Sequence, residues 1–123
     1  MIESMIKLLI PFLITVESSG NDSAVGDHGR AVGCLQIHVQ VIEDVNRVYK
    51  TKFTDKDRLD RAKSIEICSL YLCHWAEVME RNHGKGVSLQ DLARIWNGGP
   101  KGYHKEATVA YWCRVEKMMM DTE

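Results

Sequence analysis

One glycine-rich segment, residues 18–35, separates two stretches whose apolar residues recur with helical spacing. The segment reads SSGNDSAVGDHGRAVGCL and holds four glycines among Asn, Asp and Ser side chains. Glycine disfavours a regular helix, and the polar residues disfavour a buried strand. We therefore expect a structured loop here, with a short strand pair that turns at Gly26–Asp27–His28–Gly29.

Apolar residues elsewhere recur every three or four positions, which is typical of amphipathic helices. This spacing predicts helices over 2–16, 36–49, 55–82, 89–95 and 104–120. Pro11 removes one backbone donor, so the first helix either starts near it or kinks there. The helix over 55–82 is apolar on most faces and should lie at the centre. We predict one mainly α domain over residues 1–123, with about five helices and a glycine-rich loop or small β-hairpin after the first.

Polar residues mark several helix ends. Thr54 followed by Asp57 is close to a capping box, and Ser88 with Asp91 predicts another helix start. The segment Asn97–Gly98–Gly99–Pro100 is expected to break the helix before it.

Length and charge exclude several classes of protein. A chain of 123 residues fits one domain, and its net charge of −1 comes from 16 basic and 17 acidic side chains. Such a balance gives no general attraction to nucleic acid or to anionic membranes. No apolar run approaches the roughly 20 residues of a spanning helix, so we expect no stable membrane insertion. The longest one, Leu8–Val16, is followed by Glu17 rather than by a small-residue cleavage site, which predicts a buried helix and not a signal peptide.

The four cysteines are Cys34, Cys68, Cys73 and Cys113. They are too few for a disulfide scaffold, and we expect mostly buried, reduced thiols. Neither they nor the five histidines form a CxxC or HExxH ligand pair, so we predict no metal site and no cofactor.

Glu17 is the first candidate for chemistry. It follows an apolar helical stripe and precedes the glycine-rich segment. A carboxyl group at the edge of an apolar face loses solvation, which raises its pKa and keeps it protonated near neutral pH, as a general acid requires. The alternative is a solvated glutamate at a helix end.

Four short blocks occur in a characteristic order. They are Glu17–Ser18, Gly33–Cys34–Leu35–Gln36, Trp96–Asn97–Gly98–Gly99–Pro100 and Thr108–Val109–Ala110–Tyr111. This order and spacing resembles the lysozyme-like superfamily, most closely the branch of soluble lytic transglycosylases and goose-type lysozymes. The resemblance extends from about residue 6 to 115. Trp96 stands where that family usually has tyrosine, so any role of that hydroxyl is lost.

The resemblance implies a lysozyme-like fold and cleavage of the β-1,4 bond between N-acetylmuramic acid and N-acetylglucosamine in peptidoglycan. Glu17 would donate the proton to the leaving oxygen. Transglycosylases of this kind work with one glutamate, whereas two-carboxylate hydrolases need a second acid. Asp27 is the best candidate for it, although Asp27 could equally be a turn residue. Glu43 and Asp44 are further options.

The resemblance also predicts a set of substrate-binding residues. They are Ser18, Gln36, Trp96, Asn97, Gly98 and Tyr111. Amide groups of Gln36 and Asn97 suit hydroxyl and N-acetyl groups, and Gly33 would let the loop approach a sugar closely. Trp96 and Tyr111 would stack on sugars, or else belong to the core.

These features predict a monomeric, peptidoglycan-cleaving enzyme. A small domain without a signal peptide suits a phage-encoded endolysin, which would wait in the cytoplasm and reach the wall through a holin or on a virion. The alternative is a non-catalytic lysozyme-like module that binds glycan or serves a structural role. A DNA-binding or scaffolding protein is disfavoured, because acidic residues interleave with the basic cluster over 50–63.

Overall fold

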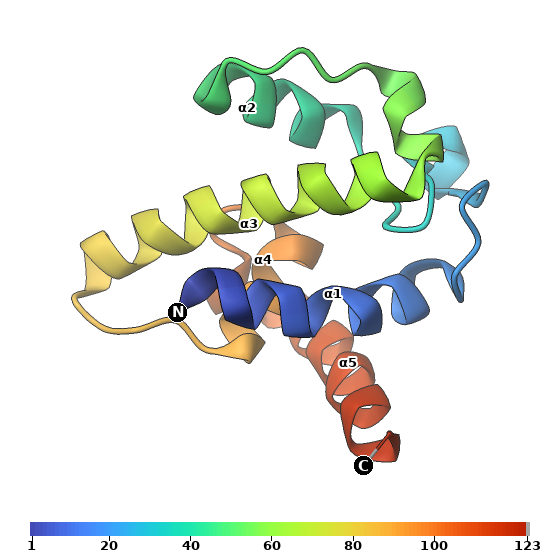
Figure 1. Ribbon diagram of the computed structural model, residues 1–123. Helices are drawn as coiled ribbons and strands as arrows, with labels where there is room; N and C mark the ends of the chain where they lie inside the picture. Colours follow the sequence, from blue (N-terminus) through green and yellow to red (C-terminus); the bar gives the residue numbers. More distant parts are fainter. Residues whose placement is uncertain (123) are drawn as a thin grey trace.

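Five α-helices dominate the computed structural model, which describes residues 1–122 (Figure 1). They are α1 (Ile2–Ser18), α2 (Val39–Tyr49), α3 (Arg61–His83), α4 (Leu89–Gly98) and α5 (Val109–Asp121). Four short 3-10 turns join them: η1 (Asp27–Gly29), η2 (Asp55–Leu59), η3 (Gly102–His104) and η4 (Glu106–Thr108). Two antiparallel strands, β1 (Val25–Gly26) and β2 (Ala31–Val32), follow α1. The predicted fold class, mainly α with a small hairpin after the first helix, is confirmed.

The glycine-rich segment forms the hairpin at the predicted place. Its turn, η1, contains Asp27 and His28 with φ of 50° and 59°, and Gly29 with φ of 88°. Three consecutive residues in the left-handed region reverse the chain sharply, and glycine at the third position relieves the strain.

Helix α1 continues through Pro11, so the prediction that it could start there is wrong. Its buried face comprises Ile6, Leu9, Ile10, Leu13 and Ile14. The helix ends where Ser19 adopts a left-handed conformation and donates its N–H to the carbonyl of Thr15 at 3.0 Å.

Helix α2 begins three residues later than predicted, at Val39. Gln36 has a φ of 50°, and Ile37 forms a bridge with Val32 of the hairpin. This bridge holds residues 36–38 outside the helix, as an extension of the hairpin.

The helix predicted over 55–82 is two elements. The predicted capping box of Thr54 and Asp57 is present, but it opens the short turn η2. The chain then becomes extended at Asp60, whose carboxylate accepts a 3.0 Å hydrogen bond from the N–H of Lys63 and caps α3. A second cap at Asp60, the residue directly after η2, thus splits the predicted helix.

The missing side chain of Gly33 leaves space for the backbone of Arg58, and not for a sugar as predicted. A Cβ at this position would lie 1.8 Å from the carbonyl oxygen of Arg58. The buried Arg58 side chain donates to the carbonyls of Ile37 at 2.9 Å and Arg30 at 3.3 Å. These contacts fasten the hairpin region to η2.

Helix α4 extends beyond its predicted end. The predicted cap at Ser88 is confirmed, and together with Asp91 it forms a capping box. Asn97 and Gly98 belong to the helix, which stops at Gly99 with a φ of 90°. Helix α5 begins at Val109 rather than at residue 104, because two 3-10 turns precede it.

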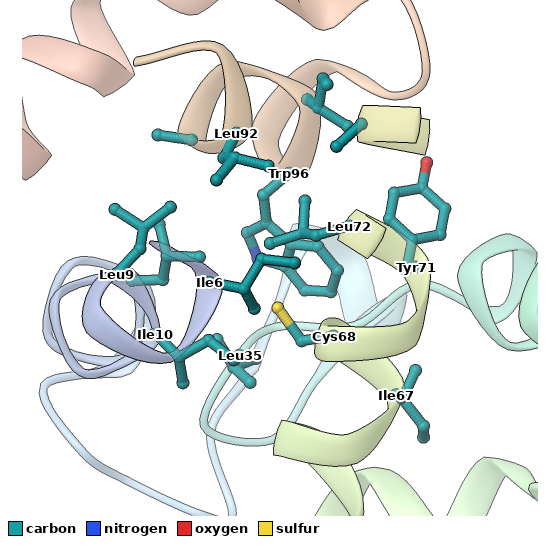
Figure 2. Packing of buried hydrophobic residues seen from close by; sticks show 14 of the residues in the cluster. Ile6, Leu9, Ile10, Leu35, Ile67, Cys68, Tyr71, Leu72, Leu92 and Trp96 are labelled. Carbon is teal, nitrogen blue, oxygen red and sulfur yellow. The ribbon is translucent and has the colours of Figure 1, made fainter. Parts of the chain in front are cut away.

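Helix α3 lies at the centre, as its apolar character predicts. It contacts α1, α2 and α4, with α2 on one side and α1 and α4 on the other (Figure 1). Fully buried leucines from separate elements meet in the core (Figure 2): Leu9 of α1, Leu35 after the hairpin, Leu72 of α3 and Leu92 of α4. This core fixes the end of α1 against α3 and α4.

All four cysteines carry free thiols, as predicted, although only Cys34 and Cys68 are buried. Cys73 is partly buried, and Cys113 is exposed. Within residues 1–122, no helix has both the length and the apolar character needed to cross a membrane.

Candidate active site

A cavity of about 430 Å³ lies where the hairpin, the start of α2, the middle of α3 and the end of α4 meet the end of α1. Five of the predicted site residues line it: Glu17, Asp27, Gln36, Trp96 and Asn97. Segments far apart in the sequence therefore converge on one cavity.

Glu17 occupies the last turn of α1 and is partly buried. The hydroxyl of Tyr111 donates a 2.8 Å hydrogen bond to its Oε2. Burial raises the pKa of Glu17 to about 7, against the opposing effects of that hydrogen bond and of the Arg114 charge. Because a large fraction of the carboxyl groups is protonated near neutral pH, Glu17 can both donate and accept a proton there.

Asp27 lies in the turn of the hairpin, at the rim of the same cavity. Its Oδ1 is 3.1 Å from Nη2 of Arg30, and its Oδ2 is 3.2 Å from Nε2 of His38. Both carboxylate oxygens therefore have a nitrogen partner. Asp27 is thus a turn residue that also lines the cavity, and its role as a second catalytic carboxylate stays a prediction.

The other two candidates for a second carboxylate are not in this cavity. Glu43 and Asp44 on α2 line a neighbouring one. Asp44 accepts a 2.6 Å hydrogen bond from Nε1 of Trp75 and forms an ion pair with Arg47. Neither carboxylate lines the cavity that contains Glu17.

Gln36 lines the cavity, but its amide nitrogen is engaged elsewhere. Nε2 donates to the carbonyls of Ala24 at 3.1 Å and Gly33 at 3.0 Å. Its Oε1 lies 2.5 Å from the position that a Cβ on Gly26 would occupy. The side chain thus ties the hairpin together instead of offering its N–H groups to a sugar.

Trp96 and Asn97 end α4 at the cavity. Trp96 is 9% exposed and packs edge-to-face on Tyr71, with ring centroids 5.7 Å apart. It belongs mainly to the core and closes one wall. Asn97 is exposed, and its amide has no hydrogen-bond partner in the described part of the chain. Asn97 is the better placed of the two for a polar ligand.

Three predicted substrate-binding residues do not line the cavity. Ser18 donates its hydroxyl to the carbonyl of Cys34 at 2.8 Å. Gly98 packs against Thr108, whose Cγ2 would lie 2.4 Å from a Cβ on that glycine. Tyr111 is buried behind Glu17. These three residues lie outside the lining of the cavity, and their contact with a sugar stays a prediction.

Tyr71 is one of the cavity residues that sequence reasoning missed. It lies in the middle of α3, where apolar residues occupy most faces. Helical periodicity gives core and cavity residues the same spacing, so no sequence pattern distinguishes Tyr71 from its buried neighbours.

No group of three or more His, Cys, Asp or Glu side chains within residues 1–122 could hold a metal ion. The sequence matches no protein-family model, and comparison with curated proteins finds none similar to it. The chemistry of the cavity is therefore the main guide to function.

Proposed function

We propose that this protein is a glycosidase that cleaves the β-1,4 bond between N-acetylmuramic acid and N-acetylglucosamine in peptidoglycan, with Glu17 as general acid and base. The observation that carries the proposal is the Glu17 carboxyl group, which lines the cavity with its pKa raised to about 7. The choice of peptidoglycan as substrate rests on the four sequence blocks that resemble those of lytic transglycosylases and goose-type lysozymes.

In the first step, protonated Glu17 gives its proton to the glycosidic oxygen as the bond from that oxygen to the anomeric carbon breaks. The sugar develops oxocarbenium character, and Glu17 becomes a carboxylate. The hydrogen bond from Tyr111 stabilises that carboxylate, because a hydroxyl donates more strongly to a charged acceptor.

In the second step, the Glu17 carboxylate takes a proton from the nucleophile that attacks the anomeric carbon. Water as nucleophile gives a reducing-end sugar. The 6-hydroxyl of the same muramic acid gives a 1,6-anhydro ring, and no water is consumed. Either route returns Glu17 to its protonated form.

The contacts of Asp27 with Arg30 and His38 fit the one-carboxylate scheme. A general base needs a free oxygen directed at the nucleophile. Both oxygens of Asp27 already face nitrogen atoms of Arg30 and His38. We therefore assign Asp27 to holding the rim of the cavity, and the base step to Glu17.

The test compares the wild type with Glu17→Gln on purified peptidoglycan, by release of soluble glycan fragments. The amide cannot donate an acidic proton, so the rate should fall by about 100-fold or more. Binding to sedimented peptidoglycan should persist. Glu66→Gln is the matched control, because Glu66 is exposed on α3 and lines no described cavity. That variant should retain full activity.

Undiminished release of fragments by Glu17→Gln would overturn the assignment. A folded wild-type protein that binds peptidoglycan and releases no fragments would instead be a glycan-binding module.

A further inference from the structure

A second cavity of about 390 Å³ adjoins the first. Its lining residues are Gln40, Val41, Glu43, Asp44, Arg47 and Tyr71. Three of them, Gln40, Val41 and Tyr71, also line the cavity that contains Glu17. The two cavities therefore form one continuous groove along α2 and α3, with Tyr71 at their junction.

Tyr71 carries a polar group that the protein itself does not use. The residue is only 6% exposed, and its hydroxyl has no hydrogen-bond partner among residues 1–122. Figure 2 shows the ring at the edge of the core cluster with its oxygen at the outer end. No fully buried side-chain nitrogen or oxygen in the described chain lacks a hydrogen-bond partner, so the Tyr71 hydroxyl is accessible at the cavity wall, where it can bind a ligand.

The Tyr71 hydroxyl is a hydrogen-bond donor at any physiological pH. Burial, and then the negative charge of Asp44, raise its pKa to about 12. A protonated phenol can donate to a carbonyl or carboxylate oxygen of a bound molecule.

The far part of the groove is ionic. The guanidinium group of Arg47 pairs with Asp44, yet its side chain is 65% exposed and keeps further N–H donors. Glu43 is exposed and has no ion pair in the described chain. The hydroxyl and acetamido groups of a glycan are neutral, whereas these walls offer the free N–H donors of the Asp44-paired Arg47 and the unpaired carboxylate of Glu43 to a ligand that carries both charges.

Resting on the proposed function, we propose that the second cavity binds the peptide branch of peptidoglycan. This peptide is attached to muramic acid and carries free carboxylates and, in most forms, a free amine. With the glycan in the Glu17 cavity, the branch passes Tyr71, which donates a hydrogen bond to it. Arg47 then pairs with a peptide carboxylate, and Glu43 faces the amine.

The experiment compares two substrates: peptide-substituted glycan strands, and the same strands after an amidase has removed the peptides. We expect the wild type to cleave the substituted strands with about tenfold higher kcat/KM, the effect of one charge-assisted hydrogen bond. Arg47→Gln should raise KM for substituted strands and abolish the preference, with bare strands cleaved as before. Tyr71→Phe should reduce the preference.

Arg81→Gln is the matched control, because Arg81 is exposed near the end of α3 and lines neither cavity. It should keep the preference. Equal cleavage of the two substrates by the wild type would overturn this inference and leave the proposed function intact. An equal loss on both substrates in Arg47→Gln would also overturn it. Cleavage of neither substrate by the folded wild type would overturn the proposed function itself.

Discussion

Tyr111 and Glu17 are joined by a 2.8 Å hydrogen bond although 94 positions separate them in the sequence. The bond connects the first turn of α5 to the last turn of α1. It places a neutral donor on a carboxyl group whose pKa is otherwise raised by burial. The C-terminal helix therefore helps to set the protonation state of the proposed catalytic acid.

Replacing Tyr111 by phenylalanine should shift the pH dependence of cleavage. The Tyr111 hydrogen bond lowers the pKa of Glu17, so its loss raises that pKa further above the value of about 7. A general acid works while protonated, and its activity is lost as pH rises through its pKa. The basic limb of the rate profile should therefore move to higher pH.

The control for that profile is Tyr103→Phe, which removes a hydroxyl that pairs with His83 at 2.6 Å, outside the Glu17 cavity. Its profile should match the wild type. A basic limb that stays in place or moves to lower pH in Tyr111→Phe would contradict the role given to this bond.

Glu17 should also make folding stability depend on pH. Its pKa rises from an ordinary value of 4.5 in the unfolded chain to about 7 in the fold. Below pH 4.5 the carboxyl group is protonated in both the folded and the unfolded chain, so its burial does not lower the free energy of unfolding. Between pH 4.5 and 7 only the unfolded chain releases the proton, so stability falls as pH rises, by up to about 3 kcal/mol.

The Glu17→Gln variant has no titratable group at this position. We therefore expect the free energy of unfolding of the variant, relative to that of the wild type, to be higher at pH 8 than at pH 4 by up to about 3 kcal/mol. Urea unfolding at the two pH values measures this difference. Parallel stability curves for the two proteins would mean that the carboxyl group is well solvated in the fold.

Gly33 should tolerate no side chain. It has a φ of 89°, and a Cβ would lie 1.8 Å from the Arg58 carbonyl oxygen. Gly33→Ala should lower the free energy of unfolding by about 3 kcal/mol or more, through the steric clash and the strained backbone together.

Gly29→Ala is the matched control, because Gly29 has nearly the same φ of 88° and nothing within 4 Å of its Cβ position. It should lose only about 1–2 kcal/mol. Equal losses in the two variants, measured by urea unfolding, would show that the contact with Arg58 contributes nothing.

Asp27→Asn should reduce cleavage by less than about tenfold. Both carboxylate oxygens are paired, with Arg30 and His38, and the side chain is 45% exposed. An asparagine keeps one acceptor for these contacts. Initial rates on purified peptidoglycan measure the effect, with Asp22→Asn as a control that breaks an ion pair with Arg61 outside the cavity. A loss of 100-fold or more would make Asp27 the second carboxylate.

Much of the fold follows from local patterns in the sequence. The apolar spacing predicts all five helices, and the predicted caps at Thr54 and Ser88 are both present. The errors arose where tertiary contacts decide the conformation. Periodicity predicts Gln36 in a helix, but its hydrogen bonds to the carbonyls of Ala24 and Gly33 hold it in the hairpin region.

The candidate site was less predictable than the fold. Glu17 stood out because a carboxylate ended an apolar stripe, and its place in the cavity agrees with that reasoning. The positions of Ser18 and Tyr111 behind the site depend on how α1 and α5 pack, which no local pattern records. Tyr71 was hidden by the apolar residues around it on α3.

The most direct test of the central claim is mass spectrometry of the products formed from purified peptidoglycan by the wild type and by Glu17→Gln. The wild type should release disaccharide-containing fragments, ending either in 1,6-anhydro-muramic acid or in a reducing sugar one water heavier, and Glu17→Gln should release neither. The absence of both products with folded wild-type protein, or their equal release by the variant, would contradict a catalytic Glu17.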